Sequence, residues 1–132
     1  MAHGIRAIAT DGAPQPVGPY SQAVAAGGFV FCAGQIPLDP RTGKLVEGPI
    51  DVQTTRVLEN VKAVLEAAGS GLDQVVKTSV FLADLADFGA MNEVYARYFS
   101  ADPKPARTTI QAAALPARAR VEIEVVAVAP AL

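Results

Sequence analysis

The chain has 132 residues, of which 51% are hydrophobic and 18% are charged, and its formal net charge is −2. This composition excludes an intrinsically disordered chain, which combines low hydrophobicity with high net charge. The slight negative charge argues against a protein that binds nucleic acid through a basic face. With one cysteine and one histidine, a Cys/His zinc site and an intramolecular disulfide are excluded within one chain. The length suits a single domain over residues 1–132.

No targeting or membrane signal is visible in the sequence. The start of the chain lacks the basic stretch followed by roughly 7–15 apolar residues that marks a signal peptide. No run approaches the roughly 18 apolar residues of a membrane helix. We therefore expect a cytoplasmic protein without a membrane partner.

The first third of the chain predicts a short strand followed by a β-hairpin. Residues 5–10 alternate weakly between polar and apolar side chains, which favours a short strand. Residues 22–26 and 29–33 are apolar runs separated by Gly27-Gly28. Two glycines between two such runs are typical of a two-residue hairpin turn.

Two helices are predicted in the middle of the chain. Residues 51–68 carry apolar side chains at intervals of three and four, as the buried face of a helix requires. Asp51 is the predicted N-cap of this helix, and Gly69 is predicted to end it. A second helix is predicted to begin after Asp87, its N-cap. The side chains on its buried face are those of Phe88, Met91, Val94, Tyr95 and Tyr98.

Three further strands complete the predicted fold, over residues 75–82, 107–113 and 120–128. The order β-β-α-β-α-β-β predicts an α+β fold in which two helices pack on one face of a mixed sheet. Alternation assigns Ile110 to the apolar, helix-covered face and Arg107 to the other face. That second face combines polar with apolar residues, and we expect it to be a partly wet surface between subunits.

The first candidates for chemistry are one arginine and two glutamates. Arg107 begins a strand after a proline-rich approach, and its planar guanidinium suits bidentate capture of a carboxylate. An ordinary surface arginine fits the same spacing. Glu122 and Glu124 share a strand face, so their side chains start about 7 Å apart. Such a pair can perform general acid–base catalysis, or it can form a solvated strand edge.

The local sequence around four other residues indicates what each can do. Tyr20 follows a Gly-Pro turn that could hold its phenol toward a cleft, although a tyrosine after a turn is more often a packing residue with a wet hydroxyl. Asn92 follows a predicted core residue and fits a boundary position that bonds to a loop. Cys32 lies on an apolar strand without a histidine beside it, which indicates a small buried hydrophobe. His3 lies too near the terminus to be a good catalytic candidate.

Six short motifs follow one another along the chain, each occurring once. They are Gly18-Pro19-Tyr20-Ser21-Gln22-Ala23, Ala33-Gly34-Gln35-Ile36-Pro37, Asn60-Val61-Lys62-Ala63, Met91-Asn92-Glu93-Val94-Tyr95, Pro105-Ala106-Arg107-Thr108-Thr109 and Val121-Glu122-Ile123-Glu124. Together they cover nearly the whole chain and resemble the RidA (YjgF) family.

The resemblance implies a fold similar to chorismate mutase and a homotrimer with clefts between neighbouring subunits. The active members of this family are imine deaminases. They hydrolyse 2-imino acids such as 2-iminopropanoate and 2-iminobutanoate, which exchange with 2-aminoacrylate and its homologues, to 2-keto acids and ammonia. The resemblance therefore predicts a small imino or keto acid as ligand and further copies of the chain as partner. It predicts no metal and no cofactor, because free imines already hydrolyse in water.

The resemblance also implies roles for individual residues. Arg107 would hold the substrate carboxylate in a two-pronged pair. Glu122 would orient and deprotonate the attacking water and then return a proton to the leaving nitrogen. The hydroxyl of Tyr20 would complete the catalytic set, and Glu124 would form an ion pair with Lys77. The expected substrate-binding residues are Arg107, Ala33, Asn92 and Thr109.

Two departures from the family pattern bear on the activity. Ala33 stands where many members carry serine, and Thr109 where some carry cysteine. Loss of the serine hydroxyl removes a possible hydrogen bond, worth about 0.5–1.5 kcal/mol net. The arginine and the glutamate remain, so deaminase activity is still expected.

Two other functions stay open from the sequence. A non-catalytic module could bind 2-keto acids or similar metabolites at the same arginine. Some family members carry the label of an RNA-cleaving translation inhibitor. That chemistry usually recruits histidines, and RNA binding needs a basic groove with stacking aromatics. His3 and an aromatic content of 6% do not favour it.

Overall fold

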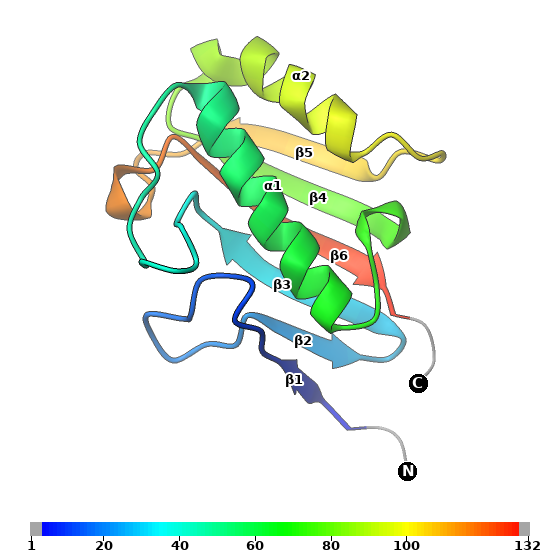
Figure 1. Cartoon of the computed structure of the whole chain (residues 1–132). Coiled ribbons are helices and arrows are strands. Elements are labelled where there is room, and N and C mark those ends of the chain that lie inside the picture. The colour runs from blue at the N-terminus through cyan, green and yellow to red at the C-terminus, as the bar shows by residue number, and fades with distance from the viewer. Residues whose placement is uncertain (1–3, 130–132) are drawn as a thin grey trace.

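The computed structural model describes residues 4–129, which form a six-stranded sheet with two α-helices on one face (Figure 1). The strands are β1 (Arg6–Ile8), β2 (Ala23–Ala26), β3 (Phe29–Gln35), β4 (Val75–Leu82), β5 (Ala106–Gln111) and β6 (Val121–Val128). The helices are α1 (Ile50–Ala67) and α2 (Phe88–Tyr98), and short 3-10 turns lie at Leu72–Gln74, Leu85–Asp87 and Pro116–Arg118. The predicted α+β class is confirmed, and the order β-β-α-β-α-β-β holds from β2 to β6. The short strand predicted over residues 5–10 is β1, which makes the sheet six-stranded.

The order of strands across the sheet is β1-β2-β3-β6-β4-β5. Neighbouring strands are antiparallel except β4 and β5, which are parallel. A parallel pair needs a crossover connection, and here α2 supplies it. α1 packs against β3 and β6 and contacts α2. The helices therefore cover one face of a mixed sheet, as predicted.

Local signals determine the hairpin and the end of α1. Gly27 and Gly28 have φ angles of +60° and +85°, the left-handed conformations that a type I′ turn requires. Gly69, at φ +77°, ends α1: its N–H donates to the Glu66 carbonyl, and the next N–H donates to the Leu65 carbonyl. The hairpin and this helix end are confirmed.

The predicted N-cap of α1 is wrong by two residues. Pro49 occupies the cap position, in extended conformation, and Asp51 lies in the first turn of the helix. Proline suits the start of a helix because it has no N–H to leave unpaired. The carboxylate of Asp51 still lies where the positive end of the helix dipole favours it.

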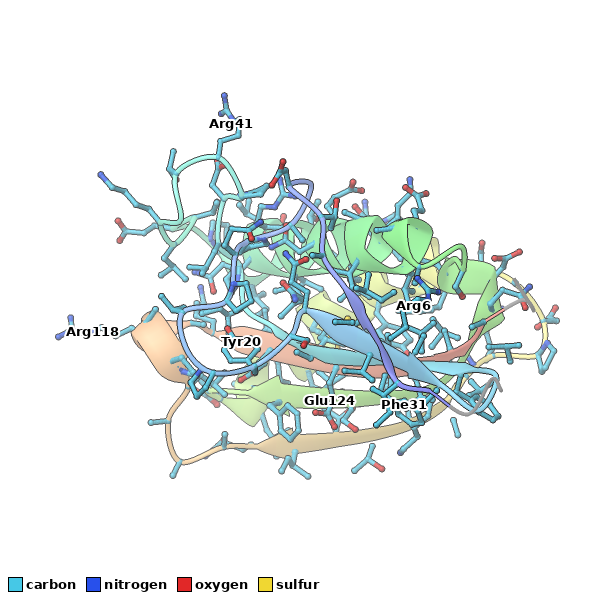
Figure 2. All side chains as sticks on the ribbon, turned by 90° about the horizontal axis from the view of Figure 1, so that it is seen from below. Arg6, Tyr20, Phe31, Arg41, Arg118 and Glu124 are labelled. Atoms are coloured by element: carbon cyan, nitrogen blue, oxygen red, sulfur yellow. The ribbon has the colours of Figure 1, made fainter. Side chains whose placement is uncertain are left out.

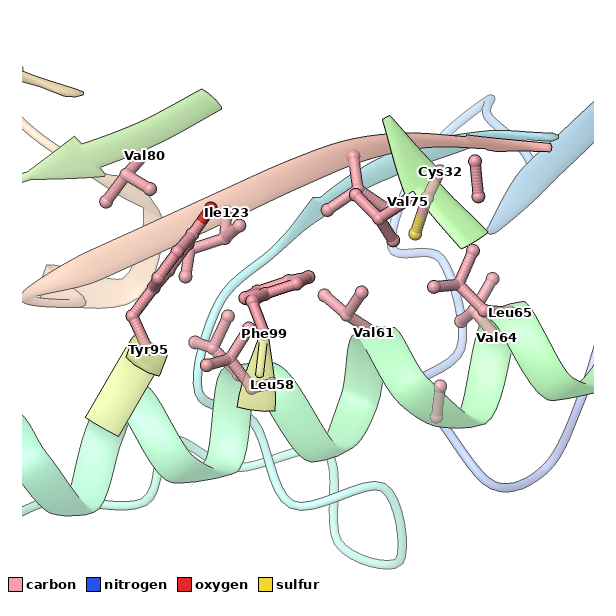
Figure 3. Packing of buried hydrophobic residues seen from close by; sticks show 14 of the residues in the cluster. Cys32, Leu58, Val61, Val64, Leu65, Val75, Val80, Tyr95, Phe99 and Ile123 are labelled. Atoms are coloured by element: carbon pink, nitrogen blue, oxygen red, sulfur yellow. The ribbon is translucent and has the colours of Figure 1, made fainter. Parts of the chain in front are cut away.

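The core fills the space between the helices and the sheet (Figure 3). Its largest fully buried side chains are Leu58, Leu65, Leu82, Met91 and Ile123. Cys32 is buried in the same cluster, as predicted for a small hydrophobe. Burial, with a smaller contribution from Glu124, raises the pKa of its thiol to about 12.

The predicted faces of β5 are reversed. Arg107 and Thr109 pair with Thr78 and Val80 of β4, which are both buried, so these two side chains lie on the helix-covered face. Ile110 lies on the open face and is 47% exposed. The prediction failed because β5 is an edge strand beside α2. At this edge α2 covers the stem of Arg107, while the guanidinium reaches the border of the sheet.

Two features of β4 bear on the open face. Val75 is buried and Val76 is exposed, because the ladder between β4 and β6 shifts register after Val75. Lys77 donates to the hydroxyl of Thr108 at 2.9 Å. No ion pair between Lys77 and Glu124 is found in the described part of the chain.

The open face of the sheet mixes apolar with charged groups, as expected from alternation. Figure 2 shows Phe31 and Glu124 on the side of the sheet away from the helices. Phe29, Phe31 and Val128 are large apolar side chains that remain exposed there. Within residues 4–129, neither helix combines the length and the apolar character that crossing a bilayer demands.

Candidate active site

A small cavity lies between the 11–20 loop, the end of β3 and the start of β6. Its volume is about 110 Å³. Most of its wall is apolar, and Tyr20 and Glu122 are among the polar groups that border it. Small-molecule sites commonly have this character, an apolar wall with few convergent polar groups. The remaining lining residues are Pro14, Gln15, Val17, Gln22, Gly34, Gln35, Ile36, Leu38 and Pro116.

Glu122 is the ionisable group of this cavity. It is half-buried, and burial raises the pKa of its carboxyl above the usual value, with a further increase from repulsion by Glu124. Within residues 4–129 the carboxylate has neither a hydrogen-bond donor nor an ion-pair partner. A half-buried carboxylate with a raised pKa and no partner can accept a proton and return it.

Tyr20 reaches the cavity from a loop that one buried glutamine anchors. The side chain of Gln22 accepts from the Thr10 N–H at 2.7 Å and donates to the Thr10, Ala13 and Pro14 carbonyls. The Tyr20 side chain is exposed, and its hydroxyl accepts from the Val17 N–H at 3.4 Å. Figure 2 shows Tyr20 on this loop. The predicted orientation of its phenol toward a cleft agrees with this geometry.

Gly34, and not Ala33, borders the cavity. The Ala33 N–H donates to the Gln22 carbonyl at 2.9 Å, so it is already engaged. The ladder between β3 and β6 is irregular between Cys32 and Gln35, which takes residue 34 out of regular pairing. Gly34 lies so close to Glu122 that a β-carbon on it would overlap the carboxylate.

Arg107 belongs to a second cluster, on the helix-covered face at the edge of the sheet. Its Nη1 donates to the Asn92 side-chain oxygen at 2.6 Å. Its guanidinium carbon lies 5.4 Å from the ring centroid of Phe88 and 4.8 Å from that of Tyr95. These three partners come from one face of α2, because they are spaced by four and three residues. The arginine is therefore held in place, and several of its N–H groups have no partner within residues 4–129.

Thr109 shares this second cluster by its position on β5. It lies two residues beyond Arg107 and so points to the same face of the sheet. Its hydroxyl oxygen is buried and has no hydrogen-bond partner within residues 4–129. Buried polar atoms are rarely left unpaired in native proteins. Because the oxygen has almost no accessible surface in one chain, a ligand held by Arg107 would reach it only after the side chains around it moved.

One chain does not bring the two clusters together. Arg107 pairs across from buried Thr78, whereas Glu122 pairs across from Phe81, whose side chain points to the open face. The arginine and the glutamate therefore lie on opposite faces of one sheet. Of the predicted residues, Tyr20 and Glu122 border the cavity, and Arg107, Asn92 and Thr109 form the second cluster. His3 lies outside the described residues.

Sequence reasoning assigned no role to three residues that the structure places in these clusters. They are Gly34, Phe88 and Tyr95. The two aromatics carried a readable signal, because they stand four residues before and three after Asn92 and so share its helix face. Gly34 carried none, since its closeness to Glu122 depends on the pairing of β3 with β6.

Known proteins match the chain along almost its whole length. The sequence model of the family described as Endoribonuclease L-PSP matches residues 10–129. A RutC family protein of Pyrococcus horikoshii is 55% identical over 91% of this chain and 94% of its own length. Reactive Intermediate Deaminase A, chloroplastic, of Arabidopsis thaliana is 50% identical over 91% of this chain and 64% of its own length.

The same relationship holds in three dimensions. The crystal structure of E. coli TdcF with bound serine has a TM-score of 0.88 and 42% identity to this chain, and the match covers 93% of this chain and 98% of that one. Sequence and fold thus agree over the same residues as the six motifs, and the chain belongs to the RidA (YjgF) family.

Proposed function

We propose that this protein is an imine deaminase that hydrolyses small 2-imino acids, such as 2-iminopropanoate and 2-iminobutanoate, to 2-keto acids and ammonia. Family membership and the similarity to a protein named Reactive Intermediate Deaminase A support the reaction class. The observation that carries the proposal is that two side chains have the properties that the reaction needs. One is a guanidinium fixed with free N–H groups, and the other is a carboxylate of raised pKa beside a small cavity.

The reaction is a hydrolysis without a redox step. Water adds its oxygen to the C=N carbon and forms a C–O bond, and the nitrogen takes up a proton. The C–N bond then breaks, the nitrogen leaves as ammonia, and a C=O bond forms. This sequence needs an anchor that positions the carbon and one group that accepts and returns protons.

Arg107 suits the role of anchor. A 2-imino acid carries its carboxylate next to the reacting carbon, so a grip on the carboxylate also positions that carbon. Asn92 occupies one end of the guanidinium, and the ring faces of Phe88 and Tyr95 occupy none of its N–H groups. The other N–H groups have no partner in the part of the chain that the structure describes, and they can form a bidentate bond to the carboxylate. Thr109 lies on the same face of β5 two residues beyond Arg107 and would border the bound acid.

Glu122 suits the role of proton carrier. Its ionised form would take a proton from the attacking water and give it to the nitrogen. A raised pKa makes the carboxyl a better base than an ordinary glutamate and so a better match to water activation. Tyr20 borders the same cavity and would orient the water or the nitrogen through its hydroxyl.

We further propose that each site is built by two copies of the chain within a homotrimer. Arg107 and Glu122 lie on opposite faces of the sheet, so one copy would supply the anchor and a neighbour the carboxylate. The open face carries exposed apolar side chains, including Phe31 and Ile110, which a second copy would cover. The cavity beside Glu122 would then be closed by the neighbour's Arg107 cluster.

A coupled assay tests the activity. The protein is added to a threonine or serine dehydratase reaction, and release of the 2-keto acid is followed. The wild type should accelerate release, whereas Arg107→Ala and Glu122→Gln should each lose at least about 100-fold of that acceleration. A wild-type protein without effect on the imine would overturn the proposed reaction.

Mixing the two inactive variants tests the shared site. If one copy supplies Arg107 and its neighbour Glu122, mixed trimers of Arg107→Ala and Glu122→Gln contain an intact pair at one interface. Activity should then return after unfolding and refolding the two variants together, but not after each is refolded alone. Mixed trimers without activity would contradict sites built between copies.

A second candidate is a binding module without turnover. The relative TdcF was crystallised with bound serine, which shows that a protein of this fold holds a small acid. In this chain the same Arg107 cluster would bind a 2-keto acid. Tight binding of 2-oxobutanoate together with no acceleration of imine hydrolysis would favour this function over the deaminase.

A further inference from the structure

We propose that Tyr95 is a positioning residue for substrate binding, acting through Arg107, and that Thr78 fixes it in that role. The inference rests on the proposed function, because it takes Arg107 as the group that binds the substrate carboxylate. It adds an assignment for two buried residues that touch neither the cavity nor the substrate.

The contacts of Arg107 point to Tyr95 as its main support. The guanidinium carbon lies 4.8 Å from the Tyr95 ring centroid, closer than the 5.4 Å to that of Phe88. The single hydrogen bond to Asn92 fixes one nitrogen of the guanidinium but does not fix the tilt of the guanidinium plane. Cation–π attraction strengthens when the pair is shielded from water, and Tyr95 is 8% exposed. The ring therefore determines the plane in which the free N–H groups lie.

Tyr95 is itself held at both ends. Its hydroxyl lies 2.8 Å from the hydroxyl of Thr78, in a buried hydrogen bond. Its ring packs on Phe99, with ring centroids 4.5 Å apart. Figure 3 shows Tyr95 reaching from α2 toward the sheet, with its hydroxyl at the tip beside Ile123.

These contacts link Arg107, Thr78 and Tyr95 to one another. Thr78 on β4 is the residue directly paired with Arg107 on β5. Tyr95 bonds to Thr78 and lies under the guanidinium, so strand, helix and edge strand constrain one another. Loss of the hydroxyl bond would let the ring tilt and would change the direction of the arginine without removing it.

The phenol acts in its neutral form. Burial raises the pKa of Tyr95, and the bond to Thr78 and the charge of Arg107 offset this only in part. A neutral phenol cannot act as a base, and the hydroxyl of Tyr95 is already engaged in the buried bond with Thr78. What Tyr95 contributes is the position of a ring face, which predicts an effect on binding of the acid rather than on proton transfer.

The test compares two tyrosines of the same helix. Tyr95→Phe and Tyr98→Phe each remove one hydroxyl from α2, and Tyr98 bonds to Glu59 at 2.7 Å, away from Arg107. For each variant, kcat and KM for the imine and Kd for 2-oxobutanoate are measured. Tyr95→Phe should raise KM and Kd about threefold with kcat little changed, and Tyr95→Leu should raise both about tenfold. Tyr98→Phe should leave both constants at the wild-type values.

Variants of Thr78 provide a second, independent test. Thr78→Val should raise KM to the extent that Tyr95→Phe does, and Thr78→Ser, which keeps a hydroxyl, should restore the wild-type value. The double variant should be no worse than either single one, because both remove the same bond. Circular dichroism and melting temperature establish that each variant is folded before its constants are compared.

Two outcomes would overturn the inference. One is an unchanged KM and Kd in Tyr95→Phe and Thr78→Val, and the other is an equal rise in Tyr98→Phe, which would indicate a general weakening of α2. A wild type that binds 2-oxobutanoate but does not hydrolyse the imine contradicts the proposed deaminase alone. In that case the Kd values still decide the role of Tyr95.

Discussion

Gly34 lies directly against the carboxylate of Glu122. A β-carbon built on residue 34 would overlap one carboxyl oxygen and would lie 3.0 Å from the carboxyl carbon. The backbone of Gly34 needs no positive φ, so an alanine would fit the chain conformation itself. Position 34 therefore requires glycine because the carboxylate approaches the backbone too closely to leave room for a β-carbon.

Gly34→Ala should leave the fold intact and reduce activity. The group that must move is the end of a flexible side chain, so the cost to stability is small. The carboxylate would be displaced by about 1 Å, which can reduce turnover about 100-fold. The measurement is kcat in the dehydratase-coupled assay. Gly12→Ala is the matched control, because its new carbon would meet nothing closer than 3.4 Å, and near-normal kcat in Gly34→Ala would contradict the role of Glu122.

The raised pKa of Glu122 predicts a pH dependence of stability. Its pKa lies above 4.5 in the folded chain, so the folded state binds a proton more tightly than the unfolded state. The free energy of unfolding therefore decreases as pH rises through the interval from that ordinary value to the raised one. Glu122→Gln lacks this titration. Its stability relative to the wild type should increase as the pH rises above 4.5 and should level off once the carboxyl of Glu122 is ionised in the folded wild type.

Urea unfolding at several pH values measures this difference. Glu124→Gln is the informative companion, because it removes the repulsion that contributes to the raised pKa of Glu122. In that variant the loss of stability should be smaller and should end at lower pH than in the wild type. Parallel stability curves for the wild type and Glu122→Gln would show that the carboxyl of Glu122 is not desolvated by the fold.

The elements that sequence predicted well are those with local causes. The Gly27-Gly28 turn follows from two adjacent left-handed residues, and Gly69 ends α1 by hydrogen bonds to the preceding turn. The buried face of α1 follows from a spacing within eighteen residues. None of these features depends on which strand pairs with which.

The candidate site was predicted in its residues but not in its arrangement. The face on which Arg107 lies depends on the parallel pairing of β5 with β4 and on the cover that α2 provides. Simple alternation assigned it to the side that also carries Glu122. That Arg107 and Glu122 lie on opposite faces of the sheet could not be predicted from β5 or β6 alone. The register of each strand depends on pairing with residues far away in the chain. The same holds for the approach of Gly34 to Glu122.

Cys32 should resist thiol reagents in the folded protein. Its side chain is 5% exposed and its thiol pKa is raised to about 12, so the reactive thiolate is scarce and shielded. Ellman's reagent at pH 8 should label the protein only after denaturation by guanidinium. Thr42→Cys adds a thiol in an exposed turn and should react in the native state. Rapid native labelling of the wild type would contradict the burial of Cys32.

The pair of Asp87 and Arg120 should stabilise the start of α2. Arg120 Nη2 donates to both carboxylate oxygens of Asp87 at 3.1 Å, and the Arg120 N–H donates to Gln53 of α1. Asp87→Ala removes this partly buried link and should lower the free energy of unfolding by about 1 kcal/mol. Asp51→Ala, in the exposed first turn of α1, should cost only about 0.3–0.5 kcal/mol through the helix dipole. Urea unfolding at one protein concentration measures both, because self-association would make stability depend on concentration. Equal losses in the two variants would mean that the contact with Arg120 adds nothing.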